Sequence, residues 1–414
     1  MRRALDHAVR LGILLGPALL AGCSSNIASE AAASSSADAA HGPEMPQEAG
    51  AAWDATSASE ADAAGMQDHL SEDVIAHADA AAAEGGFLHD GGVTDGEVTR
   101  DAPSPDCDED ATDAPTQLAC TGLYSDWPSR TFAPNVRAYA PAFPLWSDGA
   151  EKARFVALPP GTQIDTSDMD QWQFPVGTKF WKQFSFGGRL VETRFLWKRG
   201  DGDWARTTYA WSLDGSTATE LTSGQRNWNG TSYEIPPESD CQACHAGRID
   251  NVLGFEAVSL AAPGATGLTL DELVREGLLT QPPAAPIVVP GNATESAALA
   301  WLHANCGTTC HNRTSWDCNT TLFMRLDVAT LSSVETTDTW TTAVGQALVN
   351  FVAPSPMLRI APGDPSRSAV SYRASVRDTD PSQSNQMPPM DTHVVPDAGV
   401  AVINAWIAAI PPVP

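Results

Sequence analysis

Residues 241–245 read CQACH, and they separate two parts of the sequence with different hydrophobic patterns. The part before them has short runs of β-branched and aromatic residues between Gly-containing turns, which is typical of strands. The part after them places apolar residues at helical spacing. The strand-like runs are ARFVAL (153–158), KFWKQFSF (179–186), LVETRFLWK (190–198) and ARTTYAW (205–211); the helix-like runs are ESAALAWLHAN (295–305), TTAVGQALVNFV (341–352), SRSAVSYRASV (366–376) and DAGVAVINAWIAAI (397–410). The sequence predicts a multidomain α+β protein, in which a β-rich, sandwich-like domain precedes a mainly α domain.

The β-rich part is also rich in tryptophan and contains one charged segment. Eight of the 13 Trp lie between Trp127 and Trp228. Such residues can form a sugar-binding platform, but cross-strand aromatic pairs and sheet core are the commoner arrangement. Residues 143–161 include Asp148, Glu151, Lys152 and Arg154. We interpret this segment as a strand entered through a turn, with a solvated charged edge.

The chemistry of CQACH depends on the spacing of Cys241, Cys244 and His245. Two thiols separated by two residues can reach the two vinyl groups of one porphyrin, and the adjacent His can supply an axial nitrogen to its iron. A zinc site shared with a later Cys pair and a redox dithiol are the alternatives. A four-Cys zinc site needs no His after each pair, and no βαβ unit is visible for the dithiol. The motif therefore predicts covalently attached haem c.

A second, irregular motif lies at residues 305–311, NCGTTCH. Three residues separate Cys306 from Cys310, one more than in the first motif, and His311 follows directly. We expect a second haem here, with two ways of attaching it. In the first, Cys306 and Cys310 both form thioethers to the haem and the loop between them bulges. In the second, Cys318 forms a disulfide with Cys306, and Cys310 alone forms a thioether.

The order of elements in residues 293–411 resembles type I c-type cytochromes. A helix leads into the Cys–His motif, further helices follow, and a loop that reads QMPPM (386–390) precedes the final helix. In that family the Met of a Met-Pro loop is the second axial ligand. The resemblance implies that His311 and Met387 ligate one iron, with Met390 as the alternative because it also abuts the Pro pair.

Two six-coordinate irons need four axial ligands. His245, His311 and Met387 supply three of them, and the fourth position stays open. The candidates are His303, Met324, Met357 and His393. If no residue fills this fourth axial position, the first iron would be five-coordinate and able to bind a small molecule such as peroxide or oxygen.

A wider resemblance covers residues 121–411. Its motifs are LWSDGAEKARF, FPVGTKFWKQF, ETRFLW, the first Cys–His motif followed by VLGFEAVSL, then LHANC and MPPM. Together they resemble a family of secreted bacterial di-haem proteins, in which a β-rich domain precedes two haem motifs. The sequence departs from that family at the second motif, where two intervening residues are expected.

The N-terminus indicates export. Three Arg precede the apolar run LGILLGPALL, which ends in LAGC (20–23), so residues 1–22 are expected to be a signal peptide. LAGC resembles a bacterial lipoprotein cleavage box, which implies cleavage before Cys23 and lipid attachment to it. An ordinary secretory signal is the alternative. The Ser residues after Cys23 favour the outer membrane, with the protein facing the periplasm or the surface.

Residues 23–118 are predicted to be a disordered acidic tether. From residue 24 onward they contain 21 Asp or Glu against one Arg, which accounts for −20 of the chain's net charge of −27. This charge excludes nucleic acid as a partner. Cys107 and Cys120 flank the start of the folded part and are expected to form a disulfide in an oxidising compartment. We expect a β-rich domain over 119–280 and a helical cytochrome c-like domain over 281–414.

These observations predict a membrane-anchored di-haem cytochrome that transfers electrons between redox partner proteins in the cell envelope. One alternative is a haem enzyme, either peroxidase- or oxidase-like or the electron-accepting subunit of a periplasmic dehydrogenase. The other is a binding lipoprotein stabilised by zinc or disulfides. No catalytic triad, phosphate loop or His-Glu-x-x-His helix is visible, so no catalytic residue is predicted.

Overall fold

The computed structural model describes residues 107, 113–315, 320–380 and 383–412. The signal peptide, Cys23, most of the tether and Cys318 lie outside these residues. The described residues belong to one compact unit of the chain. Within them, no helix is both long enough and apolar enough to cross a membrane.

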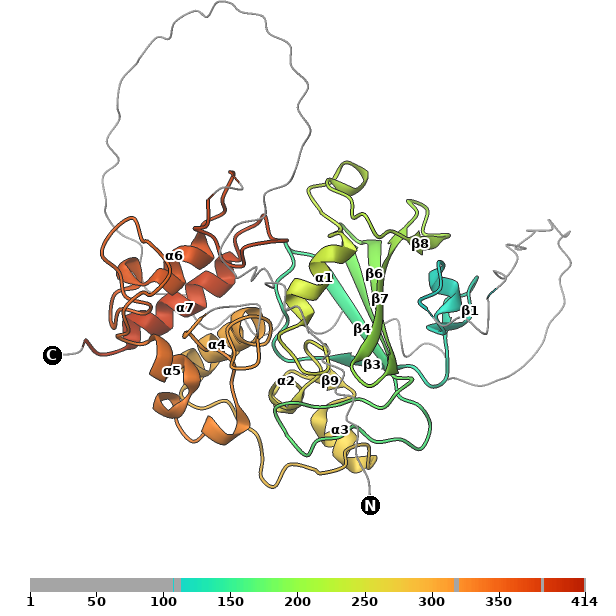
Figure 1. Cartoon of the computed structure of the whole chain (residues 1–414), viewed down its shortest axis with the longest axis horizontal. Helices are drawn as coiled ribbons and strands as arrows, with labels where there is room; N and C mark the ends of the chain where they lie inside the picture. The colour runs from blue at the N-terminus through green and yellow to red at the C-terminus, as the bar shows by residue number, and fades with distance from the viewer. Residues whose placement is uncertain (1–106, 108–112, 316–319, 381–382, 413–414) are drawn as a thin grey trace, which may run out of the picture. The chain divides into compact units, whose positions relative to one another are not determined.

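A seven-stranded antiparallel sheet forms the β-rich part (Figure 1). Its strand order is β8-β7-β6-β5-β4-β3-β9, so strands β3 to β8 form a meander in chain order and β9 returns to pair with β3. A separate pair, β1 and β2, precedes it. The strands are β1 (Tyr124–Asp126), β2 (Thr131–Phe132), β3 (Arg137–Ala140), β4 (Glu151–Ala157), β5 (Lys179–Phe186), β6 (Arg189–Gly200), β7 (Asp203–Trp211), β8 (Ala218–Glu220) and β9 (Thr266–Gly267). The sandwich-like domain expected from the sequence is thus one large sheet, covered by loops and helices instead of a second sheet of similar size.

The turn between β5 and β6 shows how the sequence sets the register. Gly187 and Gly188 have φ angles of +59° and +75°, and the flanking residues Phe186 and Arg189 pair with each other. Two-residue hairpin turns need positive φ at both central positions, which glycine adopts without a steric penalty. The FGG turn therefore sets the pairing next to it, and an irregularity between Phe184 and Ser185 shifts the register of the rest of β5 and β6.

One face of the sheet is an aromatic core. Trp181 and Phe195 lie side by side on β5 and β6, with ring centroids 5.5 Å apart, and Tyr209 on β7 continues the row. Leu118 and Leu123, which precede the meander, pack against this row and are fully buried. The tryptophans of these strands are core residues, as the sequence analysis favours, and not an exposed platform.

The other face joins the sheet to the helices. Val156 on β4 and Phe180 on β5 belong to the same buried cluster as Leu299, Trp406 and Ile407 of the C-terminal helices. The two predicted domains therefore share one apolar core.

The helices are short and begin at clear sequence signals. Asn292 accepts hydrogen bonds from the amides of Thr294 and Glu295, and Glu295 bonds back to Asn292, which is a capping box at the start of α4. Gly399 of α7 lies against Trp301 so closely that a Cβ atom would collide with the indole ring. The helices are α1 (Glu238–His245), α2 (Ala257–Ala261), α3 (Leu270–Arg275), α4 (Ala293–Leu302), α5 (Asp338–Ala343), α6 (Ala369–Ser375) and α7 (Asp397–Ala409). Single turns are η1 (Leu118–Cys120), η2 (Trp228–Gly230), η3 (His303–Gly307), η4 (Val328–Thr330), η5 (Val334–Thr336) and η6 (Pro365–Arg367).

The helix predicted over residues 341–352 is wrong beyond its first turn. Helix α5 ends at Ala343, because Val344 forms a β-bridge with Ile360 and Gly345 has a φ of +69°. The amide of Gly345 donates to the carbonyl of Ile360 at 2.9 Å. Pairing with a distant segment overrides the local apolar pattern here.

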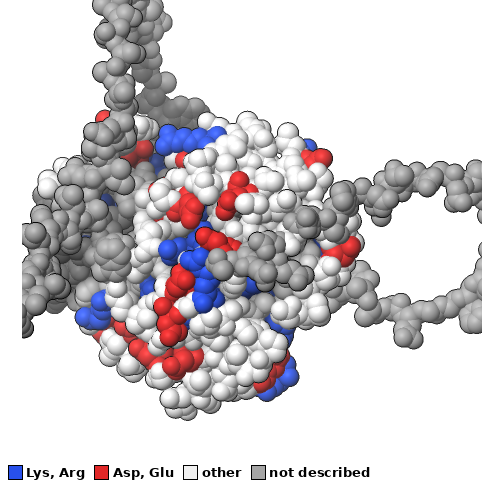
Figure 2. Space-filling view, turned by 45° about the vertical axis from the view of Figure 1, so that its right-hand side comes forward, with Lys and Arg blue, Asp and Glu red and all other residues white. Residues whose placement is uncertain are grey.

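Charges of both signs are interspersed on the surface. Figure 2 shows one face, on which Lys and Arg side chains gather near the middle and Asp and Glu side chains border them. From residue 119 onward the chain has 20 Lys or Arg and 29 Asp or Glu, a net charge of about −9. The acidity of the whole chain therefore comes mainly from residues outside the described part.

Candidate functional site

The first motif lies on α1. Cys241 and Cys244 are in the helix, and His245 is its last residue. Cys241 and Cys244 are three residues apart, so they share one side of the helix. His245 is oriented by its Nδ1, which lies 2.5 Å from the carbonyl oxygen of Asn251. No described residue hydrogen-bonds to its Nε2. Burial lowers the pKa of His245 to about 4, so the ring is neutral at physiological pH and Nε2 is an available ligand atom.

Asp250 precedes Asn251 in the chain and binds the sheet through its side chain. This buried carboxylate accepts hydrogen bonds from Lys198 Nζ at 2.8 and 2.9 Å, from Trp204 Nε1 at 2.9 Å and from the amide of Phe174 at 2.5 Å. The loop after α1 is thereby tied to strands β6 and β7. Asp250 could not be identified from the sequence, because its partners lie far away along the chain.

The second motif, Cys306, Cys310 and His311, follows directly on α4. The helix ends in one wide turn, η3, with hydrogen bonds of the π type. The carbonyl of Cys306 then accepts from the amides of Cys310 at 3.2 Å and His311 at 2.8 Å. A π turn accommodates one more residue than an α turn, which explains how the three-residue spacing is absorbed.

His311 is oriented in the same way as His245. Its Nδ1 lies 3.1 Å from the carbonyl oxygen of Leu322. Burial lowers its pKa to about 4, so this ring too is neutral at physiological pH. Both motifs therefore hold Nδ1 against a backbone carbonyl and leave Nε2 for a ligand.

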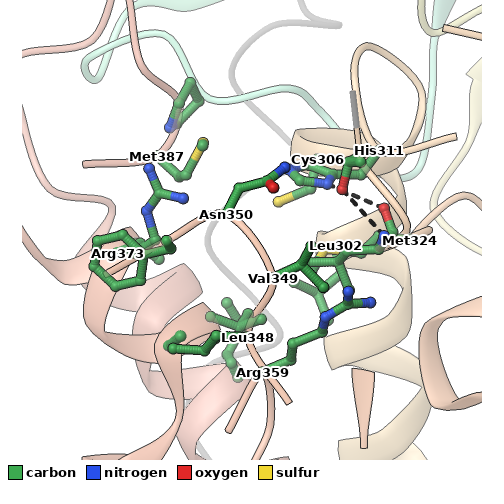
Figure 3. Close-up of a pocket in the computed structure, with 18 of the residues that line it drawn as sticks. Leu302, Cys306, His311, Met324, Leu348, Val349, Asn350, Arg359, Arg373 and Met387 are labelled. Atoms are coloured by element: carbon green, nitrogen blue, oxygen red, sulfur yellow. Dashed lines mark hydrogen bonds between the residues drawn. The ribbon is translucent and has the colours of Figure 1, made fainter. Parts of the chain in front are cut away.

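A cavity opens beside the second motif (Figure 3). The space in it that water can occupy is about 140 Å³. Cys306 and His311 lie on one side of it and Met387 on the other. Most of the remaining lining is apolar, and it includes Trp301, Leu302, Leu322, Met324, Leu348, Val349, Val370, Ala374, Pro388 and Ile403. A His nitrogen and a Met sulfur thus face one apolar cavity from different elements.

The loop that carries Met387 is held on both sides. The amide of Met387 donates to the carbonyl of Arg373 at 2.8 Å. The carboxylate of Asp378 accepts from the amides of Asn385 at 2.7 Å and Gln386 at 3.0 Å. Met387 is therefore presented by a loop with little freedom to move.

Asp148 fastens the same loop further along and corrects one sequence interpretation. Its carboxylate accepts from Thr392 Oγ1 at 3.0 Å and from the amides of His393 and Val394 at 2.7 and 3.2 Å. The LWSD segment is thus a clamp on the residues after MPPM, and not a solvated edge. Lys152 is likewise directed inward, with its Nζ 2.5 Å from the carbonyl oxygen of Leu145.

The two motifs are neighbours. A Cβ atom on Gly247, two residues after His245, would collide with the carbonyl of Thr309, between Cys306 and Cys310. Thr314 Oγ1 donates to the carbonyl of Gly247 at 3.0 Å. The loop that follows the first motif therefore packs directly on the loop of the second.

The candidates for a fourth axial ligand lie in different environments. His303 has both ring nitrogens engaged: Nδ1 accepts from the amide of Leu326 at 2.9 Å, and Nε2 lies 3.3 Å from Glu256. His393 is half exposed and bonds to Glu234 through Nε2.

The methionines differ in the same way. Met324 lines the cavity of the second motif, and its amide donates to the carbonyl of His311 at 2.7 Å. Met357 and Met390 are partly buried and do not line that cavity. Asp391, next to Met390, interacts electrostatically with Cys244 and Arg194, so the MPPM loop also approaches the first motif.

The four cysteines of the motifs do not converge on a metal site. Among the described residues, no group of three or more His, Cys, Asp or Glu side chains could hold a metal ion. Cys306 forms no disulfide with any described residue. The zinc alternative thus gains no support from the described part of the chain.

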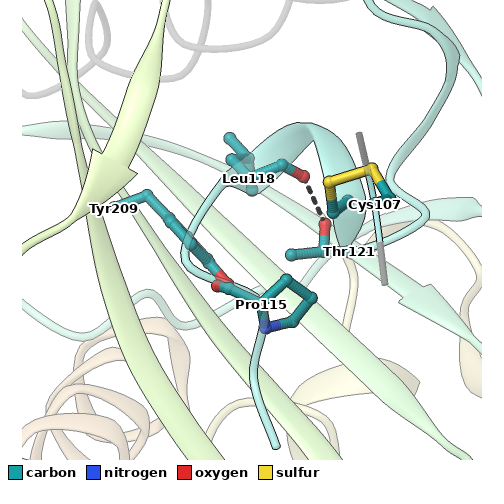
Figure 4. The surroundings of a disulfide bond; sticks show 6 residues. Cys107, Pro115, Leu118, Thr121 and Tyr209 are labelled. Carbon is teal, nitrogen blue, oxygen red and sulfur yellow. Dashed lines mark hydrogen bonds between the residues drawn. A yellow bond between two sulfur atoms is a disulfide. The ribbon is translucent and has the colours of Figure 1, made fainter. Parts of the chain in front are cut away.

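Cys107 and Cys120 form a disulfide, as the sequence analysis expects (Figure 4). Thr121 Oγ1 donates to the carbonyl of Leu118 at 2.8 Å, and Trp181 Nε1 donates to Thr121 Oγ1 at 2.9 Å. Tyr209 also donates to the carbonyl of Pro115 at 2.6 Å. The cross-linked segment is thus anchored to the sheet.

Comparison with known proteins gives no relative: no family model, no curated protein and no solved structure matches the chain.

Proposed function

We propose that this protein is a di-haem c-type cytochrome that transfers electrons in the cell envelope. The observation that carries the proposal is the cavity of the second motif, which His311 and Met387 face from different sides while Cys306 lines its wall. An axial His and an axial Met with a thiol in the wall are the groups that a cytochrome c-like domain offers its haem. The proposed domain comprises helices α4 to α7.

The residues of the second motif fit a haem in three respects. The cavity is lined mostly by apolar side chains, as ligand pockets of proteins generally are. His311 is neutral and its Nδ1 is bonded to a carbonyl. The Met387 loop is fixed by backbone hydrogen bonds. A haem bound here would supply one-electron chemistry, and a Met ligand raises its reduction potential relative to a second His.

The residues of the first motif also fit a haem. Cys241 and Cys244 carry free thiols on one side of α1, and His245 leaves Nε2 open beside them. The first site differs from the second because no described Met or His is held opposite His245 as Met387 is held opposite His311. His303, which could have served, is held by Glu256 and Leu326.

The contact between the two motifs favours electron transfer over an isolated catalytic centre. Gly247 and Thr309 bring the two loops together, so two haems held by these motifs would be neighbours. Redox proteins are the partners that this arrangement suits. The lipid anchor on Cys23 and an outer-membrane location belong to the same proposal and rest on the sequence alone.

A haem enzyme is the second candidate function. It is favoured by the engaged nitrogens of His303, because they leave the first iron without that ligand. A high-spin ferric signal from the first haem in the oxidised protein would support this candidate. A low-spin signal from both haems would support electron transfer.

The proposal is tested by counting covalent haems. The protein is produced in a host with cytochrome c maturation, and intact mass and a pyridine haemochrome assay are measured. Two haems per chain are expected, and none would overturn the proposal. Met387→Ala should then remove the spectral signature of Met ligation from one haem. Met390→Ala is the matched control and should leave that haem unchanged.

A further inference from the structure

Four basic side chains gather on the face of the sheet beside the first motif. Arg154 on β4 pairs with Lys182 on β5, and Lys182 pairs with Arg194 on β6, so three cations lie directly opposite one another on adjacent strands. Lys152 lies on the same face of β4, two residues from Arg154. We call Lys152, Arg154, Lys182 and Arg194 the cation cluster. Like charges placed directly opposite on a sheet are destabilising, so this arrangement needs an anion nearby.

The described residues supply too little negative charge for the cation cluster. Glu192 is buried; its carboxylate accepts from Arg194 at 2.7 and 3.0 Å and from the hydroxyl of Tyr233, and it binds no other member of the cation cluster. Among the described residues, no carboxylate lies within ion-pair distance of Lys152, Arg154 or Lys182. Asp148 and Asp391 act on the cluster only at longer range. Phe184 offers its ring to Lys182 and Arg194, which gives each a weak cation–π contact.

Burial makes this imbalance costly. Arg154 is only 7% exposed, yet it has no hydrogen bond or ion pair with any described side chain. The cluster also divides an apolar face: Val156, Phe180 and Trp204 lie to one side of it, and Phe184 and Tyr233 to the other. Burying an uncompensated charge in such surroundings is unfavourable, and burial lowers the pKa of Lys152 and Lys182; an anion bound at the cluster would let both stay charged.

The cation cluster faces the first motif. Arg206, on the same face of β7, donates to Asn251, whose carbonyl orients His245. Burial is the main reason that the pKa of His245 is low, and the charges of Lys182, Arg206 and Arg194 lower it further. Arg194 also acts electrostatically on Cys241 and Cys244. A group attached to these thiols would therefore lie near the cluster.

We propose that the cation cluster binds the propionate carboxylates of a haem held by Cys241, Cys244 and His245. A haem carries two such carboxylates on the edge remote from its vinyl groups, which matches a cluster with three unpaired cations. The inference rests on the proposed function, because it assumes that the first motif holds haem. Carboxylates from solution share this chemistry, and the experiment separates the two sources.

The test uses the mature protein with both haems. Arg154→Gln and Lys182→Gln each remove one charge, and Arg154→Lys keeps it. Arg137→Gln is the control, since Arg137 lies in the same sheet but forms a surface ion pair with Glu276. The midpoint potential of each haem is measured against pH, and the second haem is identified by its response to Met387→Ala.

Removing a nearby cation disfavours the reduced, less positive haem. We expect Arg154→Gln and Lys182→Gln to lower the equilibrium constant for reduction of the first haem about tenfold, which is ~59 mV for a one-electron couple. The unpaired propionate should then titrate, so the potential becomes pH-dependent in the acid range. Arg154→Lys and Arg137→Gln should behave as the wild type. If Arg154→Gln does not fold, Lys182→Gln carries the same test.

Three outcomes would overturn parts of the proposal. Potentials of Arg154→Gln and Lys182→Gln that match Arg137→Gln at every pH would exclude propionate binding while leaving both haems established. A wild-type potential that shifts with acetate at constant ionic strength, and no longer shifts in Lys182→Gln, would assign the cluster to carboxylates from solution. A chain without covalent haem would overturn the proposed function, and the inference with it.

Discussion

The two Cys–His motifs orient their histidines alike but differ in everything around them. Each His binds a backbone carbonyl through Nδ1, Asn251 in one case and Leu322 in the other. The first motif has regular spacing, lies on a helix against a β-sheet, and faces a charged cluster. The second has an extra residue, lies at a π turn, and faces an apolar cavity. The comparison teaches that the orientation of the His is the shared requirement, while spacing and polarity are free to differ.

The largest expected effect is the loss of one covalent haem when the first motif alone is changed. Changing Cys241 and Cys244 together to Ser should remove one of two covalent haems, because no other thiol shares their side of α1. Intact mass and the haemochrome assay measure the loss. Retention of both haems would contradict the assignment of the first motif.

The irregular motif allows a sharper comparison between its own two thiols. Cys306 lines the cavity with His311, and Cys310 does not. We expect Cys306→Ser to reduce covalent haem at the second motif more than Cys310→Ser does. The reverse order would support a single thioether from Cys310, with Cys306 paired to Cys318. Mass spectrometry of haem peptides distinguishes the two patterns.

A third prediction concerns Asp250, which supports the first motif. Asp250→Asn leaves Lys198 buried without its counter-charge, and breaking a buried ion pair in this way costs about 3–5 kcal/mol. Urea denaturation should show this loss of unfolding free energy. Asp203→Asn breaks the exposed pair with Arg199 and should cost roughly 0–1 kcal/mol. Equal effects of the two changes would mean that Asp250 does not anchor the first motif.

The sheet was readable from sequence in detail, and the surroundings of the motifs were not. The run KFWKQFSF coincides with β5, because it is rich in aromatic residues and glycines end it. The helix expected over 341–352 fails at Val344, because pairing with Ile360 is invisible locally. The expected sandwich fails for a related reason, since alternation along a strand does not reveal whether a second sheet or helices cover it.

Some functional groups could likewise be identified from local sequence, and others could not. Both motifs and Met387 could be identified from local sequence, because ligand types and spacing are local properties. Asp148 and Asp250 could not, because the first clamps a loop 244 positions away and the second binds side chains on two strands. The cation cluster needed the strand register, which places Arg154 and Lys182 side by side.

A fourth prediction tests whether the two motifs depend on each other. Gly247→Ala places a Cβ atom against the backbone of Thr309, and overpacking of this kind costs about 1–3 kcal/mol. Because one loop belongs to each motif, the potentials of both haems should shift along with the loss of stability. Gly200→Ala is the control, since its nearest neighbour would be Asp203 Cβ at 3.7 Å. A shift confined to one haem would show that the loops touch without coupling the motifs.

The last prediction is a pH dependence of stability at the cation cluster beside the first motif. Burial, and the charges of Arg154 and Arg194, lower the pKa of Lys152 to about 7, from an ordinary value of 10.5. Between these two values the unfolded chain binds a proton that the folded chain does not, so stability should rise with pH in this window. For one group the slope is at most about 1.4 kcal/mol per pH unit.

Haem attachment should change this slope, since propionates beside the cation cluster would favour the charged Lys152. We expect protein without haem to gain stability as pH rises above about 7, and protein with both haems to gain less. Lys152→Met should weaken the dependence in the haem-free protein, and Lys182, whose pKa burial also lowers, should keep the rest of it. Urea denaturation across this pH window measures both. If the slope of the unfolding free energy against pH is the same with and without haem, no carboxylate of the haem lies near Lys152. The two motifs would then differ only in the spacing of their cysteines.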